Sequence, residues 1–411
     1  MSDHETDAPP PYGAYQHEIY QRGILQGILP SITTDPNHLQ QQAKEVMRRE
    51  AYNYIAGGAG EGASMDANRL AFRQWKIVPR RMRPTVPRDL SVTLFGERYR
   101  SPVLCAPVGV QEIYHQDKEL GTASACAELG VPFIMSTAST STMSEVADAC
   151  GDQPRWFQLY WPMDDDITIS ILRTAKASGF KVLVVTLDTA TMAWRPADLD
   201  RAFLPFMTGQ GNAVGFSDPV FRQKFAEGND GETPERNPFM AAREWLNEAF
   251  SGDSHSWDHL EVLKTNWDGP IVLKGIQHPE DAISALQHGV SGIIVSNHGG
   301  RNVDGAVGSL EMLPEIVEAV GDQMTVLFDS GIRTGADVVK ALSLGAKGVL
   351  VGRPIMYGLG IAGKDGAKHV LASLLADLDT TMGLAGMKSV AGLNQGNLKR
   401  ISYGGETKSS L

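Results

Sequence analysis

Eight short runs of apolar, largely β-branched residues recur along the chain after residue 101, and they restrict the fold more than any other feature of the sequence. The runs are continuously apolar and do not alternate between apolar and polar residues. Strands with that pattern are buried on both faces, as in a parallel sheet covered by helices. The eight runs are 102–109, 131–136, 155–160, 180–187, 270–275, 290–296, 324–330 and 346–352.

Segments with helical periodicity separate these runs, among them Asp117–Leu129, Asp164–Ser178, Pro279–His288 and Ala336–Leu344. Eight strand–helix units predict an α/β fold in which the strands close into a (β/α)8 TIM barrel. A doubly wound sheet is the main alternative, but that architecture ordinarily needs fewer units.

The segments outside the barrel predict how the chain is divided. Residues 1–40 show little periodicity, whereas the apolar residues from Leu39 to Ile55 follow helical spacing. That spacing predicts a helical extension ahead of the barrel. We expect an N-terminal arm at 1–40, a barrel domain at 41–390 and a C-terminal tail at 391–411.

One connection is much longer than the others. Roughly 80 residues separate the fourth run from the fifth, and the stretch 196–256 is rich in Gly, Asn, Asp and aromatic residues. Long connections inside a compact domain are usually functional or disordered. This one follows the C-terminal end of a strand, where barrel enzymes carry their active sites. The sequence therefore predicts an active-site lid at 196–256.

The charge balance argues against several classes of partner. The formal net charge is −11, from 48 acidic and 37 basic residues, and such a surface repels nucleic acids and anionic membranes. The first residues lack the apolar stretch of a signal peptide, and no run is long enough to span a bilayer. We expect a cytoplasmic protein; the C-terminal Ser409-Ser410-Leu411 is similar to a peroxisomal address but lacks its basic residue.

No metal site is expected. Cys105, Cys126 and Cys150 match neither a disulfide framework nor a zinc site, and they are interpreted as buried, reduced thiols. His255 and His259 have a spacing that can hold a metal on a helix, but a third ligand is missing. An ordinary surface segment is the favoured interpretation.

Polar and ionisable side chains follow most of the apolar runs. Asp188 follows the fourth run, Lys274 ends the fifth, and His298 follows the sixth. Because the carboxyl ends of the strands meet at one mouth of a barrel, these side chains are expected to converge on one cavity. Taken singly, each has another explanation: Lys274 can extend to the surface, His298 can occupy a turn, and Asp188 can cap a helix.

Glycine-rich ends follow the seventh and eighth runs. Gly331 and Gly352 allow the backbone to approach a ligand and leave amide N–H groups free for an anion. Barrels commonly hold a phosphate at this place, and Arg333 and Arg353 would add charge-assisted contacts. The sequence predicts a phosphorylated cofactor or substrate.

Three features of the sequence resemble the FMN-dependent L-2-hydroxy acid oxidase family. They are the hexapeptide Ser296–Arg301, the upstream Lys274 and the downstream run Asp329–Arg333. The resemblance extends from about Tyr15 to about Gly386. Within the family, the stretches around the fourth strand and the long insertion are most similar to the branch of lactate 2-monooxygenase and lactate oxidase.

The resemblance implies that the barrel domain binds FMN. Lys274 would lie near the flavin N1 and C2 oxygen, where its cation stabilises the charge of the reduced ring. The residues implied for the cofactor are Ala106, Pro107, Val108, Gly109, Ser136, Gln158, Thr186, Lys274, Ser296, Asp329, Ser330, Gly331, Ile332, Arg333, Gly352 and Arg353.

The resemblance also implies how a substrate is bound and oxidised. His298 would be the base that takes the substrate's hydroxyl or α-proton, and Asp188 would orient it. Lys274 and Tyr160 complete the catalytic set. The residues implied for substrate binding are Tyr54, Tyr160, Arg195, His298 and Arg301, with the two arginines clamping the carboxylate.

Two positions are singled out against the family pattern. Asn302 stands where relatives usually have Gln, a change interpreted as peripheral. Ala138 stands where glycolate oxidase has Trp and lactate oxidase has Ala, and its small side chain favours lactate over glycolate.

These features together predict an FMN-dependent oxidation of an L-2-hydroxy acid, L-lactate being the first candidate, with O2 as acceptor. The products would be acetate, CO2 and water, or pyruvate and H2O2. A dehydrogenase with another electron acceptor and a non-redox, phosphate-binding barrel enzyme are the alternatives. The resemblance implies a homo-oligomer, either a tetramer or an octamer.

Overall fold

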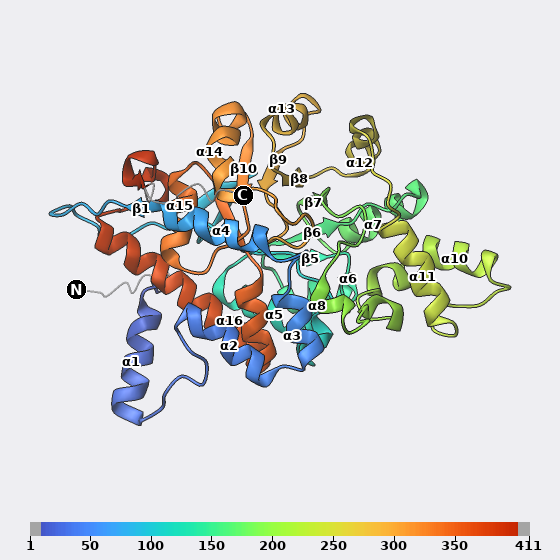
Figure 1. The fold of residues 1–411 in the computed structure, drawn as a ribbon, viewed down its shortest axis with the longest axis horizontal. Coiled ribbons are helices and arrows are strands. Elements are labelled where there is room, and N and C mark those ends of the chain that lie inside the picture. The colour runs from blue at the N-terminus through green and yellow to red at the C-terminus, as the bar shows by residue number, and fades with distance from the viewer. Residues whose placement is uncertain (1–9, 402–411) are drawn as a thin grey trace, which may run out of the picture.

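The computed structural model describes residues 10–401, which are built around a closed barrel of eight parallel strands (Figure 1). Each strand pairs with the next one along the chain, and the last closes the barrel on the first. The strands are β4 (Val103–Cys105), β5 (Phe133–Ser136), β6 (Arg155–Leu159), β7 (Leu183–Thr186), β8 (Ile271–Ile276), β9 (Gly292–Val295), β10 (Thr325–Phe328) and β11 (Gly348–Val351). They coincide with the eight apolar runs, so the predicted (β/α)8 barrel is confirmed.

Helices follow each strand and surround the barrel. The last of them, α16, bends where Ala362 and Gly363 leave helical geometry. The surrounding helices are α5 (Lys118–Leu129), α6 (Met143–Cys150), α7 (Asp165–Ala177), α12 (Leu260–Asn266), α13 (Pro279–Gln287), α14 (Ser309–Val320), α15 (Gly335–Ser343) and α16 (Arg353–Ala385).

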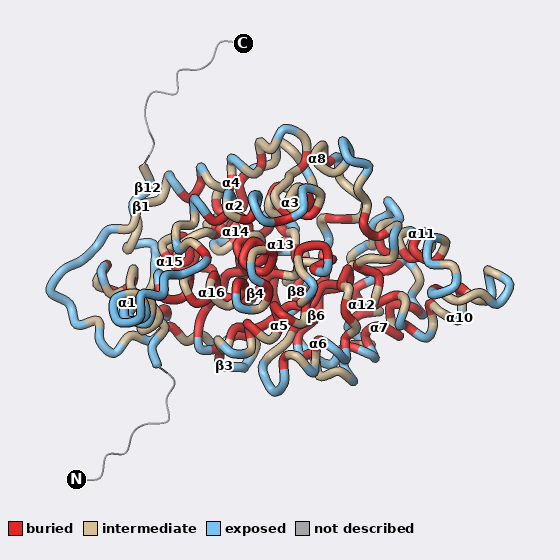
Figure 2. Tube along the Cα trace, turned by 90° about the horizontal axis from the view of Figure 1, so that it is seen from below, coloured by how far each residue is buried: buried red, intermediate tan, exposed pale blue. Residues whose placement is uncertain are grey.

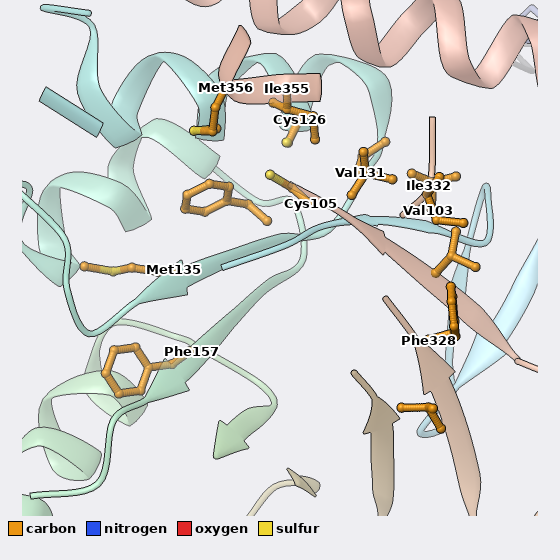
Figure 3. Close-up of a cluster of buried hydrophobic side chains, with 14 of the residues drawn as sticks. Val103, Cys105, Cys126, Val131, Met135, Phe157, Phe328, Ile332, Ile355 and Met356 are labelled. Atoms are coloured by element: carbon orange, nitrogen blue, oxygen red, sulfur yellow. The ribbon is translucent and has the colours of Figure 1, made fainter. Parts of the chain in front are cut away.

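Both faces of the strands are buried, which explains the continuously apolar runs. One cluster, which includes Leu104, Ile134 and Val184, fills the barrel interior. The other faces the helices, and Figure 3 shows part of it, with Cys105 of β4 near Cys126 of α5. Figure 2 shows the buried residues concentrated in the middle of the molecule. All three cysteines are buried and free, as expected.

A hairpin of β2 (Val92–Leu94) and β3 (Glu97–Tyr99) closes the N-terminal end of the barrel. The Trp156 indole, at the start of β6, donates a hydrogen bond of 3.2 Å to the Tyr99 hydroxyl. Phe95 in the hairpin turn packs on the same indole, with ring centroids 5.7 Å apart. Side chains of the hairpin and of β6 therefore fill this end of the barrel.

Between residue 10 and the barrel lie four helices: α1 (Ala14–Gln26), α2 (Pro36–Val46), α3 (Arg49–Ala56) and α4 (Ala63–Gln74). Helix α2 packs on α16, and β1 (Trp75–Ile77) pairs with β12 (Leu398–Arg400). Two helices thus begin within the segment predicted as an arm, and the divisions at 40 and 390 stay predictions. The Ser409-Ser410-Leu411 ending lies outside the described residues.

The long insertion is largely helical. Its helix α10 (Pro219–Gly228) packs on α7 and on α11 (Pro238–Ala249), at the end of the molecule opposite α1 (Figure 1). The helical segments are α8 (Pro196–Leu199), η2 (Pro205–Thr208), α9 (Ala213–Ser217), α10 (Pro219–Gly228) and α11 (Pro238–Ala249). Across residues 10–401, no helix is both long and apolar enough to cross a bilayer.

Candidate active site

A cavity opens at the C-terminal ends of the barrel strands, as predicted. Including its open mouth, the cavity has a volume of about 900 Å³. Most of the residues that the sequence implicates come together in its wall. Those that line it are Tyr54, Ala106, Pro107, Val108, Gly109, Tyr160, Arg195, Lys274, His298, Arg301, Asp329, Ser330, Gly331, Ile332, Arg333, Gly352 and Arg353.

His298 and Asp188 form the central pair of the cavity. The His298 Nδ1 lies 2.8 Å from Asp188 Oδ1, and His298 has a left-handed φ of 56°, a strained geometry that clusters at functional sites. Since a carboxylate only accepts, Nδ1 carries the proton and Nε2 keeps its lone pair. Burial lowers the pKa of His298 against the opposing effect of Asp188, so the ring is poised to act as a neutral base.

Lys274 places a buried cation beside this pair. Its Nζ lies 3.6 Å from Asp329, 3.9 Å from Asp188 and within 3.2 Å of the Ser296 hydroxyl. Burial opposes the charge, but Asp329 and Asp188 outweigh it and raise the pKa of Lys274. Burial likewise disfavours the Asp188 carboxylate, but Lys274 and His298 hold its pKa well below the usual range. The charged forms of both residues are therefore stable.

A bulge in β8 makes this arrangement possible. The pairing register of β8 with β9 shifts between Lys274 and Ile276. Gly275 between them has a φ of 105°, and a Cβ there would lie 2.7 Å from the Cβ of Asp188. Only glycine allows both the backbone turn and the close approach of Asp188.

Two neighbouring guanidinium groups form a second feature of the wall. Arg195 is 6% exposed, and its Nε donates to the Arg301 carbonyl at 3.0 Å. Burial, followed by the charge of Arg301, lowers the pKa of Arg195 to about 10. Arg301 donates to the backbone carbonyls of Tyr54 and Gly57 and lies over the Tyr54 ring at 5.1 Å. Two like charges held this close favour binding of an anion.

Aromatic side chains enclose the same part of the cavity. Burial raises the pKa of Tyr160 to about 12, so its phenol stays protonated and can donate a hydrogen bond. Phe206 of the insertion lines the cavity, and Phe250 packs on Tyr160 with ring centroids 4.9 Å apart. Phe203 packs edge-on against Tyr54. The sequence did not single out these three phenylalanines, because the insertion has no periodicity to mark inward positions.

Two further arginines and a helix N-terminus form another part of the cavity rim. Helix α16 begins at Arg353, and the positive end of its dipole favours an anion. Burial lowers the pKa of Arg333, and that of Arg353 to about 9. Gly331, two residues before Arg333, supplies a left-handed turn with a φ of 95°. These residues can bind a phosphate group.

Five of the implicated residues are not among those that line the cavity. Asp188 stands behind His298, while Thr186 and Ser296 sit at the ends of β7 and β9. The Ser136 hydroxyl donates to Gln158 Oε1 at 2.9 Å. The amide nitrogen of Gln158 is buried and has no hydrogen-bond partner among residues 10–401.

Three polar residues of the site escaped the sequence interpretation or were misjudged by it. Tyr114 lines the cavity, and no motif marks it. Thr189 contacts both Asp188 and His298, and only its position next to Asp188 hinted at a role. The interpretation of Asn302 as peripheral is wrong, since its side chain bonds to Arg195 and Thr189.

Comparison with known proteins gives a consistent result. A family model described as FMN-dependent dehydrogenase matches residues 43–400. An FMN-dependent alpha-hydroxy acid dehydrogenase from Penicillium citrinum is 56% identical over 98% of this chain and 100% of its own length. An L-lactate oxidase from Lysinibacillus sphaericus is 38% identical, with 86% and 90% covered. The crystal structure of a mandelate oxidase, 35% identical, superposes with a TM-score of 0.76 over 89% of this chain and 98% of that one.

Proposed function

The chain belongs to the FMN-dependent dehydrogenase family and is an alpha-hydroxy acid oxidoreductase, and from that premise we propose that it oxidises L-lactate with O2 as electron acceptor. One observation carries the proposal. The neutral imidazole of His298, with a free Nε2, shares a cavity with the guanidiniums of Arg195 and Arg301, which can bind an anion. A 2-hydroxy acid has the matching groups, a carboxylate next to a carbon that bears both a hydroxyl and the hydrogen to be removed.

The residues present fit FMN. The buried amide nitrogen of Gln158 needs an acceptor, and the ring carbonyls of a flavin provide one. The cations at Arg333 and Arg353 and the N-terminus of α16 match a phosphate group. Lys274 supplies a buried positive charge near the centre of the cavity. When bound, FMN supplies the two-electron acceptor for the carbon that carries the hydroxyl.

Side chains of the protein bind the substrate, accept the proton and exclude water. Arg195 and Arg301 bind the carboxylate and thereby place the hydroxyl-bearing carbon near His298. His298 accepts the proton at Nε2, and Asp188 stabilises the imidazolium that results. Tyr160 remains protonated and donates to a substrate oxygen. The insertion residue Phe206 excludes water from this side of the cavity.

The shape of the cavity supports a short side chain on the substrate. Ala138 lines it and is 7% exposed, with its carbonyl accepting from the Val110 N–H at 2.8 Å. Phe206 and Tyr54 bound the same region. A methyl group fits this apolar corner, which favours lactate over glycolate because the methyl contributes burial that glycolate lacks.

The pH dependence of flavin reduction follows from the charge state of His298. The base must be neutral, and burial, assisted by Lys274 and Arg195, lowers its pKa below the ordinary 6.5. The ratio of the reduction rate constant to the substrate dissociation constant, measured anaerobically, should therefore stay constant from neutral pH down to below pH 6.5 and fall only under that value. An acidic limb centred above 6.5 would contradict a neutral, buried base.

Oxygen consumption tests the electron acceptor. We expect rapid O2 uptake with L-lactate, slower uptake with glycolate, and none with D-lactate. The name of the Penicillium citrinum relative favours a second candidate, a dehydrogenase that passes electrons to another acceptor. Rapid dye reduction by L-lactate without O2 uptake would establish that alternative.

Product analysis tests the role of the insertion. Phe203, Phe206 and Phe250 cover the substrate side of the cavity, so the product should leave slowly. Pyruvate held next to newly formed H2O2 is decarboxylated to acetate, CO2 and water. We expect acetate to account for a substantial part of the lactate consumed. Equimolar pyruvate and H2O2, with no acetate, would contradict retention by the insertion.

A further inference from the structure

The Asn302 side chain lies between the two halves of the proposed site. Its Oδ1 accepts from Arg195 Nη2 at 3.2 Å. Its Nδ2 donates to the Asp188 backbone carbonyl at 2.6 Å and to the Thr189 hydroxyl at 2.8 Å. One amide thus joins a guanidinium that faces the substrate to the segment that carries the carboxylate partner of His298.

The orientation of this amide is fixed by its neighbours. The oxygen and nitrogen of an Asn side chain are normally hard to distinguish, but an arginine only donates and a backbone carbonyl only accepts. Arg195 therefore requires the oxygen of Asn302, and the Asp188 carbonyl requires the nitrogen. Both demands agree.

The fixed amide also sets the direction of the next hydrogen bonds. Because Thr189 accepts from Asn302, its single hydroxyl proton is free to point at Asp188 Oδ1, 3.0 Å away. The same oxygen is 2.8 Å from His298 Nδ1, which also lies 3.2 Å from the Thr189 hydroxyl. Asp188 Oδ1 then accepts two hydrogen bonds, one from Thr189 and one from His298 Nδ1, and the imidazole keeps its free lone pair on Nε2.

We propose that Asn302 is a positioning residue that orients Arg195 for the substrate carboxylate and, separately, orients the His298–Asp188 base through Thr189. The inference rests on the proposed function, since it assigns Arg195 to the substrate and His298 to the proton. A chain of ordered donors, Arg195 to Asn302 to Thr189 to Asp188, connects the two groups.

The two middle members of this chain, Asn302 and Thr189, predict different defects. Asn302→Ala removes all three hydrogen bonds of this side chain, so the flavin reduction rate should fall about tenfold and the substrate dissociation constant should rise roughly fivefold. Thr189→Val has the shape of threonine but no hydroxyl. It should lower the reduction rate about tenfold and leave the dissociation constant unchanged. Thr189→Ser restores the hydroxyl and should recover most of the lost rate.

The double variant separates coupling from independent damage. If Asn302 acts on the base through Thr189, Asn302→Ala/Thr189→Val should reduce its flavin about as fast as Asn302→Ala. Independent effects would multiply to roughly a hundredfold loss and overturn the proposal. Asn229→Ala is the matched control, since this amide donates to Phe225 and Glu244 in the insertion. Asn229→Ala should have the same flavin reduction rate and the same substrate dissociation constant as the wild type.

A binding measurement supplies a readout without turnover. Oxalate, a dicarboxylate that cannot be oxidised in this way, is titrated into each FMN-loaded variant while the flavin spectrum is recorded. Asn302→Ala should bind oxalate roughly fivefold more weakly, and Thr189→Val should bind it as the wild type does. If Asn302→Ala does not fold, Thr189→Val alone tests the proposal. An unchanged reduction rate, or a weakened oxalate affinity, in Thr189→Val would contradict the proposed chain of hydrogen bonds.

The outcome also distinguishes this inference from the proposed function. If L-lactate reduces the wild-type flavin while Asn302→Ala matches the wild type in rate and affinity, only the inference fails. If no 2-hydroxy acid reduces the wild-type flavin, the proposed function fails, and the inference that rests on it fails as well.

Discussion

Replacing His298 with alanine should yield a protein that keeps its FMN but reduces it about 10⁴-fold more slowly with L-lactate. The imidazole is the group that can accept a proton at the centre of the cavity, with Nδ1 bonded to Asp188 and Nε2 free. Cofactor retention is expected because the phosphate rim of Arg333, Arg353 and the N-terminus of α16 remains intact.

Anaerobic stopped-flow absorbance of the flavin provides the rate, and the FMN-to-protein ratio provides the control for cofactor loss. His17→Ala is a matched substitution on α1, where the side chain is exposed. It should reduce its flavin at the wild-type rate. A His298→Ala protein that retains FMN and reacts within about tenfold of wild type would rule out this histidine as the base.

The second large effect is expected for Lys274→Met, which keeps the length of the side chain and removes its charge. Flavin reduction should slow by about 10² to 10³, because the buried cation that stabilises developing negative charge is lost. The substitution also leaves Asp188 and Asp329 buried without their common partner. The free energy of unfolding should fall by about 3 kcal/mol, as for other broken buried ion pairs.

Denaturant unfolding of the FMN-loaded proteins measures the second effect, and stopped-flow mixing measures the first. Lys181→Met is the matched control, because Lys181 is exposed. If Lys274→Met were as stable and as fast as the wild type, the ion pairs of Lys274 with Asp188 and Asp329 would have no role in stability or catalysis.

Much of the fold could be predicted because the barrel imposes a regular pattern on the chain. Each strand is buried inside and outside, as Ile134 and Met135 of β5 illustrate, so each appears as an uninterrupted apolar run. The insertion could not be predicted in the same way. Its helices pack on neighbours far away in the chain, and nothing periodic in its sequence identifies Phe206 as a residue of the cavity.

The site residues that lie at or near strand ends could be predicted from the sequence. Contacts between side chains on loops far apart in the sequence could not. Lys274 lies at the end of an apolar run and His298 shortly after another, and a closed barrel brings such positions to one mouth. The contact between Asn302 and Thr189 joins two loops separated by more than a hundred residues. Its existence depends on the conformation of both loops, which local sequence does not specify.

The central claim is that Lys274, His298 and Arg301 act on one FMN at the mouth of the barrel, and an anaerobic titration of the purified holoenzyme tests it most directly. One equivalent of L-lactate per bound FMN should abolish the visible absorption of the oxidised flavin, and D-lactate should leave that absorption unchanged. A holoenzyme whose absorption persists in excess L-lactate and in excess of other short L-2-hydroxy acids would contradict the account.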